Sequence, residues 1–509
     1  MTLCTAVFRR RRARATSWTL SKYLLFILAF YAAICLLLDM PLLSSKLPRY
    51  SGPHEVGVID IEVPCEKRKA ADAVFKGTTH PAFELETVLF SLYYPAVQGV
   101  RSRVPHHPWI PKPLALAGEG LARFARINNV FTNGLFTFGL WMLAGSTTIP
   151  ANVDVPLQGT TKSFHDSEYQ AEQPLDEYGL PQFPVIVFSH GMASSRTSYT
   201  QWCGEMASRG FIVAAIEHRD GSGPGSIVMP GQGVKKPRFH ITARMLDPQP
   251  ETGDLKAMQL AMRQAEVEET VRVLKRIHTG HGEEVFKSNA RMEGQGLVSF
   301  KGRFMMDRMV IGGHSYGATL ALQALKTAPN EDRPFVGGLM FDPGKQSGPL
   351  NDDINVPIVI VHSQSWSAKH SIFNGRPHFE VVKDIARRLI EERRKFAWFV
   401  TAKGTTHPSV TDAPLVEPLL LSWTTGSTVD AREGVLLYVK ISKQFMHYLE
   451  TGHRQSILTE PPTHPQYDEK IKDVYPKVAN FWQIHMSPTD MCPSLGHCGL
   501  DEPDPEEND

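Results

Sequence analysis

The pentapeptide Gly313-His314-Ser315-Tyr316-Gly317 places the strongest constraint on how this chain folds. It follows the apolar run "RMVIGG" at 308–313 and precedes an alanine- and leucine-rich segment at 316–328. A serine between a strand and a helix can present its hydroxyl above a sheet only through a strained turn, in which side chains two positions away would collide. Glycines at 313 and 317 remove that collision. The pattern predicts that Ser315 is a nucleophile; the alternative is a serine in a surface turn.

Apolar runs and helical segments alternate regularly after residue 184, which indicates a mostly parallel sheet with helices on both faces. The predicted strands are 184–191, 211–218, 308–313, 336–341, 356–362 and, as the last one, 396–401, and the predicted helices are 195–209, 254–278, 316–328, 378–394 and 434–449. Strands at 54–64 and 87–96 and a helical region at 109–145 precede them. With 509 residues the chain can bury a large core. Together with the serine turn, this alternation predicts an α/β-hydrolase fold.

A serine nucleophile needs a base, and the base needs an orienting acid. In this fold the chain order is serine, acid, histidine. Asp342 directly follows the first strand after the serine, and no carboxylate stands between the next strand and Glu380. His407 lies six residues beyond the strand at 396–401. The order therefore predicts a Ser315–Asp342–His407 triad, although Asp342 could form only a turn before Pro343, and His407 could be an exposed loop residue.

An acyl-transfer intermediate also needs two backbone N–H donors for its oxyanion. The residue after the nucleophile, Tyr316, supplies one in this kind of fold. The other is expected on the loop after an early strand, where "FSHGM" at 188–192 places the amide of Met192. We expect the neighbouring His190 and His314 to be structural.

These stretches resemble the plasma-type platelet-activating-factor acetylhydrolases, a family of calcium-independent phospholipases. The resemblance is carried in order by "LYYPA" (92–96), "PWIP" (108–111), "GSTTIPAN" (145–152), "PVIVFSHGMASSRTSY" (184–199), "GFIVAAIEHRDGSG" (210–223) and "DRMVIGGHSYGAT" (307–319), and then by "FDPG" and "GTTH". It covers about residues 54–450. It implies hydrolysis of short or oxidised sn-2 acyl esters, and it places the same triad and the same two amides on Ser315, Asp342, His407, Met192 and Tyr316.

The chain departs from the family pattern at two places near the site. "PGKQSG" follows Asp342 where the family tends to have a tryptophan, and "PSV" follows His407 where it tends to have a phenylalanine. The resemblance also implies an interfacial surface of amphipathic helices, for which residues 113–145 are the candidate. Packing of an aromatic-rich cap is the alternative for that segment.

The N-terminus predicts a membrane anchor. Residues 9–14 read "RRRRAR", no acid occurs before Asp39, and sixteen uncharged residues run from Tyr23 to Leu38. We interpret 1–45 as a cytoplasmic basic segment and an uncleaved transmembrane signal-anchor, with the catalytic domain (54–450) luminal or extracellular. A cleaved signal, an organellar targeting segment or a buried helix are alternatives. Residues 451–509 form an extension, whose acidic end "DEPDPEEND" is expected to be disordered.

The residues therefore predict a membrane-associated serine esterase that needs no metal or organic cofactor, and the family resemblance implies a 1-alkyl-2-acetylglycerophosphocholine esterase acting on phospholipid. The net charge of +1 gives no reason to expect a nucleic-acid partner. A carboxylesterase, thioesterase or peptidase on the same fold is an alternative, because fold does not fix substrate. A non-catalytic membrane-anchored binding protein is a second alternative.

Overall fold

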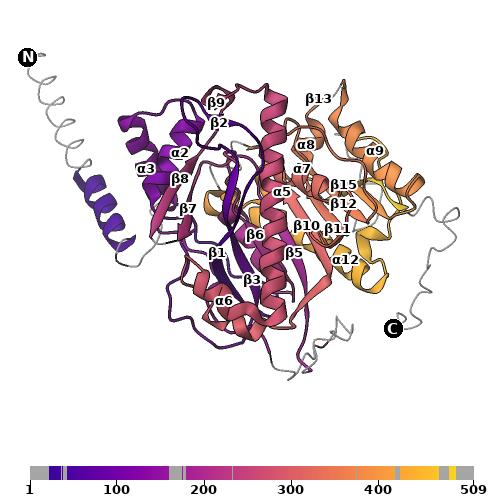
Figure 1. Cartoon of the computed structure of the whole chain (residues 1–509), viewed down its shortest axis with the longest axis horizontal. Helices are drawn as coiled ribbons and strands as arrows, with labels where there is room; N and C mark the ends of the chain where they lie inside the picture. Colours follow the sequence, from indigo (N-terminus) through magenta and orange to yellow (C-terminus); the bar gives the residue numbers. More distant parts are fainter. Residues whose placement is uncertain are drawn as a thin grey trace, which may run out of the picture.

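The computed structural model describes residues 22–35, 37, 43–159, 175, 179–231, 233–373, 375–418, 425–468 and 481–488. Their centre is a ten-stranded sheet (Figure 1). From one edge to the other its strands are β16 (Trp482–Met486), β15 (Ala397–Ala402), β12 (Ile358–Ser363), β11 (Phe335–Phe341), β10 (Phe304–His314), β5 (Phe183–Ser189), β6 (Ile212–Ile216), β3 (Glu84–Ala96), β1 (Glu55–Lys69) and β4 (Asn152–Val153).

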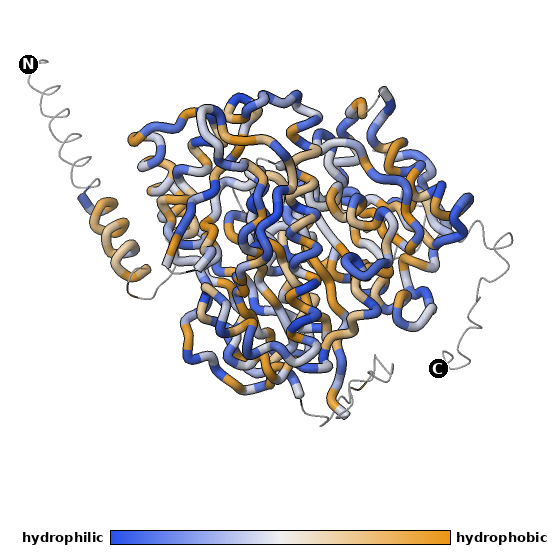
Figure 2. Tube along the Cα trace, viewed as in Figure 1, coloured by the Kyte–Doolittle hydropathy of each residue, from blue (hydrophilic) through white to orange (hydrophobic). Residues whose placement is uncertain are grey.

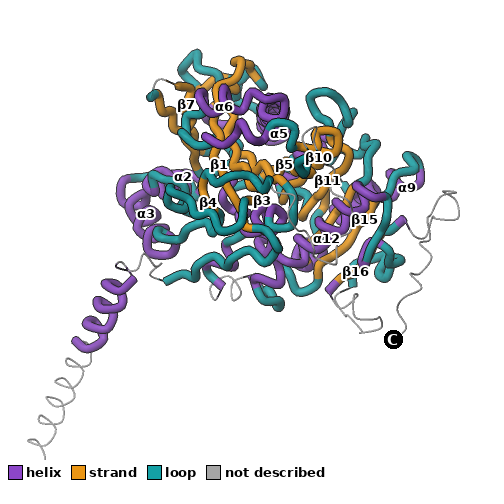
Figure 3. The backbone as a smooth tube through the Cα atoms, turned by 90° about the horizontal axis from the view of Figure 1, so that it is seen from below, coloured by secondary structure: helices purple, strands orange, loops and turns teal. Residues whose placement is uncertain are grey.

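The strands from β15 to β6 are all parallel, and antiparallel strands flank them at both sides. β16 runs antiparallel to β15, and β3 runs antiparallel to both β6 and β1. The predicted α/β architecture with a large, mostly parallel sheet is therefore confirmed. The helices that connect the parallel strands surround this sheet (Figure 3).

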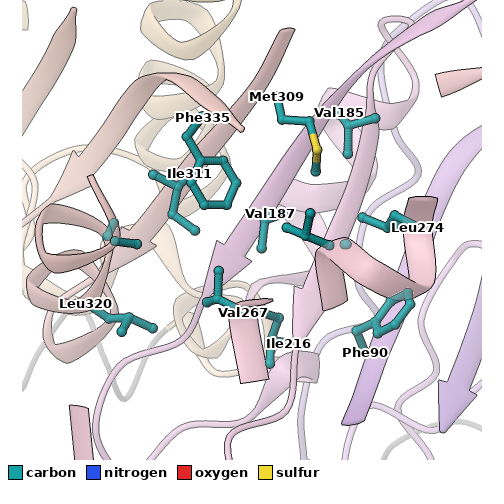
Figure 4. Packing of buried hydrophobic residues seen from close by; sticks show 14 of the residues in the cluster. Phe90, Val185, Val187, Ile216, Val267, Leu274, Met309, Ile311, Leu320 and Phe335 are labelled. Carbon is teal, nitrogen blue, oxygen red and sulfur yellow. The ribbon is translucent and has the colours of Figure 1, made fainter. Parts of the chain in front are cut away.

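Alternating side chains divide the core into two layers. On β5, Val185 and Val187 belong to the layer that contains α5 (Thr252–Arg276), α7 (Tyr316–Ala324) and α9 (His378–Glu391). Ile186 and Phe188 belong to the opposite layer, with α4 (Thr200–Ala207) and α12 (Ala431–Thr451). Figure 4 shows part of the first layer, including Val187, Val267, Ile311 and Phe335. Burial of both sheet faces explains why these strands read as continuous apolar runs.

A helical pair, α2 (Leu114–Phe124) and α3 (Val130–Ala144), fills the region predicted to be helical at 109–145. The pair packs closely, because a Cβ on Gly118 would lie only 2.2 Å from the Thr137 hydroxyl. Among the described residues, three two-stranded sheets lie outside the central sheet: β7 (Gly225–Gly231) with β8 (Val234–Phe239), β2 (Val74–Phe75) with β9 (Leu246–Asp247), and β13 (Ile372–Phe373) with β14 (Arg376–Pro377).

One prediction about the sheet is wrong. The strand at 396–401 was expected to be the last, but β16 adds to its edge from residues 482–486. Thr401 and His485 join the two strands further through a 2.6 Å contact between Oγ1 and Nε2. The segment 451–509, interpreted as an extension, thus contributes a strand to the central sheet. Its acidic end lies outside the described residues.

The predicted anchor falls only partly on described residues. Residues 22–35 are helical and largely exposed, for example Phe26 at 69% and Phe30 at 60%. They form a separate apolar helix beside the α/β body (Figures 1 and 2). Within the described part of the chain, no helix has both the length and the apolar character needed to span a bilayer. Residues 1–21, 36 and 38–42 lie outside the described part.

Candidate active site

The turn at Ser315 has the strained geometry that its sequence predicts. Ser315 joins β10 to α7 with φ 56° and ψ −118°, a conformation that is costly for any residue other than glycine. A Cβ on Gly313 would lie 2.3 Å from the carbonyl carbon of Gly317, and one on Gly317 would lie 2.0 Å from the Ser189 carbonyl oxygen. Both positions therefore require glycine, and the turn lifts the serine hydroxyl above the end of the sheet.

The three predicted triad side chains meet at this end of the sheet. The Ser315 hydroxyl donates to Nε2 of His407 at 3.1 Å, and Nδ1 of His407 donates to Oδ2 of Asp342 at 2.8 Å. Asp342 is 1% exposed, so its contact with His407 is shielded from water. This arrangement sets the histidine tautomer with an unprotonated Nε2 facing the serine, which is what a general base requires.

The end of β12 and the short helix α8 (Gln364–Ala368) after it support both partners of the serine, and the sequence analysis missed them. Ser363 donates its backbone N–H and its hydroxyl to the Asp342 carboxylate at 2.6 and 2.7 Å. Ser365 accepts the backbone N–H of His407 at 3.0 Å. These contacts fix the carboxylate and the histidine backbone. Ser363 ends β12 and Ser365 follows two residues later, so their position at the end of a buried strand is the sequence signal that could have indicated them.

The helix α8 also places an indole ring on the histidine. Trp366 stacks on His407 with ring centroids 3.8 Å apart and planes 9° apart. The Trp366 indole N–H donates to the carbonyl oxygen of Pro343, the residue after Asp342, at 3.0 Å. The sequence lacks a tryptophan directly after Asp342, but the indole of Trp366 on α8 lies against this part of the site. No local pattern in the sequence indicated it.

The two predicted oxyanion amides flank the serine. Tyr316 is the first residue of α7, so its N–H belongs to the helix turn that lacks intrahelical acceptors. Met192 follows Gly191, where an added Cβ would lie 3.2 Å from Cβ of Ser315. In the described part of the chain, neither amide donates to a protein acceptor. Their position suits an oxyanion hole, and their role remains a prediction.

The two histidines expected to be structural are buried and tied to the backbone. The Tyr199 hydroxyl lies 2.8 Å from Nδ1 of His314 and accepts the N–H of Gly191 at 3.1 Å. Burial, reinforced by His407, lowers the pKa of His314 well below its usual range. Burial lowers the pKa of His190 to about 4. His190 therefore accepts the backbone N–H of His218 at Nε2, and it donates from Nδ1 to the Gly191 carbonyl.

His314, Asp342 and His407 also form a group with metal-ligand chemistry, since one ligand atom from each lies within 4.8 Å of the others. Asp342 and His407 are already joined by the hydrogen bond described above. The Tyr199 hydroxyl occupies Nδ1 of His314. The hydrogen bonds that connect Asp342, His407 and Ser315 explain why these side chains lie together, and we assign no metal ion to them.

Comparison with known proteins identifies the family of the chain. A family model described as platelet-activating factor acetylhydrolase, isoform II, matches residues 42–456. The chain belongs to this acetylhydrolase family. The predicted resemblance is therefore confirmed.

Relatives within the acetylhydrolase family are distant but matched over most of their length. The platelet-activating factor acetylhydrolase of Bos taurus is 25% identical, over 79% of this chain and 77% of the relative. The platelet-activating factor acetylhydrolase of Gallus gallus is 23% identical, over 87% of this chain and 91% of the relative. A putative phospholipase A2 of Schizosaccharomyces pombe is 26% identical, over 79% of this chain and 91% of the relative. Membership in this family supports a carboxylic ester hydrolase.

A solved structure shares the fold. The ferulic acid esterase from Streptomyces cinnamoneus superposes with a TM-score of 0.50 at 16% identity, covering 82% of this chain and 97% of the esterase. At this identity the likeness concerns the fold alone. It agrees with the acetylhydrolase family assignment in placing the chain among α/β proteins with a large, mostly parallel sheet.

Proposed function

We propose that the protein is an α/β-hydrolase that cleaves the sn-2 acetyl or short or oxidised acyl ester of phospholipids similar to platelet-activating factor. The observation that carries the proposal is the chain of hydrogen bonds from Ser315 through His407 to Asp342, at 3.1 and 2.8 Å. Family membership supports the substrate class. Water is the second substrate.

The geometry supports a two-step mechanism. Oγ of Ser315 attacks the ester carbonyl while its proton passes to Nε2 of His407, and the carbonyl electron pair moves to the oxygen. The amides of Met192 and Tyr316 stabilise that oxyanion. Collapse expels the lysophospholipid alcohol, which takes the proton from His407. Water then attacks the acyl-enzyme by the same route and releases the carboxylate, while Asp342 stabilises the imidazolium throughout.

The experiment that tests this proposal compares esters that share one head group. We expect hydrolysis of sn-2 acetyl phosphatidylcholine to exceed that of the sn-2 palmitoyl ester at least tenfold in kcat/KM, also in excess chelator because backbone amides rather than calcium bind the oxyanion. The lysophosphatidylcholine released from each ester is measured, because both substrates give this same product. Equal rates on long chains, or activity confined to thioesters or peptides, would favour one of the other hydrolase classes. Lack of labelling by a fluorophosphonate would favour a non-catalytic protein.

The surface of α3 supports the proposed membrane partner. This helix has no charged residue, and it exposes Phe131 at 89%, Leu135 at 68% and Phe138 at 55%. Positions 131, 135 and 138 lie on one face of a helix. An exposed apolar face of this kind suits the boundary of a lipid layer, where a phospholipid ester can be reached.

Membrane association has two proposed sources, which one deletion separates. Removing residues 1–45 should release an active esterase into the carbonate-soluble fraction, because no predicted catalytic residue lies there. The truncated protein should still bind phosphatidylcholine vesicles, and Phe131→Ser with Leu135→Ser should lower that binding about tenfold or more, since each buried apolar side chain contributes about 1.5–3 kcal/mol. As a control, Ile372→Ser changes an exposed residue elsewhere.

Carbonate release of the full-length protein would contradict the anchor. Protease protection in sealed membranes tests the proposed luminal or extracellular orientation, since digestion of the catalytic domain from the cytoplasmic side would reverse it. Vesicle binding that is unchanged by the α3 substitutions would instead assign this helix to cap packing.

A further inference from the structure

We propose that Arg263, a buried arginine of α5, is a positioning residue for the oxyanion hole. Its side chain holds the Met192 segment and Tyr316 in fixed positions relative to each other. The proposal rests on the esterase function above, because it concerns the oxyanion formed in that reaction. It adds a residue that lies 52 positions before the nucleophile and outside every motif of the sequence.

A polar stripe on α5 faces the site. Gln259, Arg263 and Glu266 are each 0% exposed, and their spacing of four and three residues places them on one side of the helix. Charged side chains are almost never fully buried unless they are paired, because removing them from water is costly. The partners of Arg263 therefore indicate what this buried charge holds.

The guanidinium group of Arg263 brackets Met192 from both sides along the chain. Nη1 donates to the carbonyl oxygen of His190 at 2.7 Å, two residues before Met192. Nη2 donates to the hydroxyl of Ser222 at 2.7 Å, and the carbonyl of Ser222 accepts the N–H of Ala193, the residue after Met192, at 2.9 Å. The Met192 amide thus lies between two backbone points that depend on Arg263.

The same guanidinium group contacts the residue that carries the other donor. Its central carbon lies 4.4 Å from the ring centroid of Tyr316, a cation–π distance. The Tyr316 hydroxyl donates to Oε1 of Gln259, one turn earlier on α5, at 3.0 Å. One side chain therefore touches both segments that supply oxyanion donors, and no other cation has this pair of contacts among the described residues.

The charge of Arg263 is balanced, so its contribution is geometric. Nε donates to Oδ2 of Asp220 at 2.7 Å, and both side chains are 0% exposed. Asp220 also accepts the backbone N–H and the hydroxyl of Ser222. A planar fork that serves several acceptors at once is specific to arginine, whereas lysine offers a single ammonium on a flexible chain.

A second series of buried hydrogen bonds holds the end of β5. The Ser189 hydroxyl lies 2.7 Å from Nε2 of His218, and Nδ1 of His218 lies 2.6 Å from Glu266. This order of groups resembles a catalytic triad, but all three side chains are at most 2% exposed, so no ester can reach them. Together with Arg263 it ties the end of β5, where the Met192 loop begins, to α5.

The test replaces Arg263 with lysine, which keeps a charge for Asp220 but loses the fork. We expect kcat per active site to fall about 10–100-fold with KM nearly unchanged, because misplacing a transition-state contact by about 1 Å costs of this order. Active sites are counted by fluorophosphonate labelling. Arg303→Lys is the matched control, since Arg303 is also buried, donates to backbone carbonyls and lies over the ring of Phe183 at the opposite end of β5.

A pair of inhibitors distinguishes positioning from general loosening. A trifluoromethyl ketone accepts Oγ of Ser315 and forms a hemiketal oxyanion in the hole, whereas the matching methyl ketone binds mainly as a ground-state ligand. We expect Arg263→Lys to weaken the first about 10–100-fold and the second less than threefold. The ratio should be unchanged in Arg303→Lys.

An inhibitor ratio in Arg263→Lys equal to that of the wild type would overturn the proposal. If this variant does not fold, Arg263→Met with Asp220→Asn removes both charges without leaving one unpaired, and the same change in ratio is expected. A wild-type protein that fluorophosphonate does not label would contradict the esterase function itself. A labelled wild type with an unaffected ratio in the variants would contradict only the role of Arg263.

Discussion

Replacing Ser315 with alanine should lower esterase activity about 10⁴–10⁶-fold, because the reaction loses the atom that attacks the ester. Alanine keeps the Cβ that the turn at φ 56° already accommodates, so the backbone strain does not change. We therefore expect the thermal unfolding midpoint to stay within a few degrees of the wild type. Activity is measured on the sn-2 acetyl phospholipid, and labelling by fluorophosphonate should disappear.

Ser442→Ala is the matched control for this substitution. Ser442 is buried like the core around it, and its hydroxyl donates only to the Tyr438 carbonyl one turn back on α12. Its removal should leave both activity and labelling intact. Activity of Ser315→Ala within tenfold of the wild type would show that another residue is the nucleophile.

Replacing Asp342 with asparagine should lower kcat about 10⁴-fold. Oδ1 of Asp342 accepts the backbone N–H of Ser363, whereas Oδ2 accepts both the Ser363 hydroxyl and Nδ1 of His407. An asparagine has only one acceptor oxygen, which Ser363 would occupy, so its amide group would donate to His407. The histidine would then carry its proton on Nε2, facing Ser315, and could not act as the base.

Asp412→Asn provides a comparison that separates catalysis from burial. Asp412 is also fully buried, and it accepts the indole N–H of Trp109. It also accepts the backbone N–H and hydroxyl of Thr200 and the backbone N–H of Gln201, so its carboxylate lies against the N-terminus of α4. Burial raises the pKa of Asp412 to about 6. Its neutral replacement should change the unfolding midpoint but leave kcat within about threefold. Equal losses of kcat in the two variants would refute the assignment of Asp342 as the orienting acid.

The sequence alone predicted the α/β architecture and the three side chains that meet above the sheet. Local rules carry this information: the strained turn at Ser315 needs glycines two positions away, and buried parallel strands read as apolar runs. Because the strands succeed one another in a known order, the chain position of Asp342 and His407 after particular strands was enough to bring them to the serine. The amide of Tyr316 follows from the turn itself.

Only the tertiary structure revealed the groups that hold those side chains in place. Trp366 and Ser365 lie about forty residues before His407, and β16 joins β15 from about eighty residues later, so no local periodicity links them. Arg263 lies within the 25-residue helix α5, among several other charged residues of that helix. Its burial is favourable only because Asp220, Ser222 and the His190 carbonyl converge on it in space, and that convergence is a property of the folded chain.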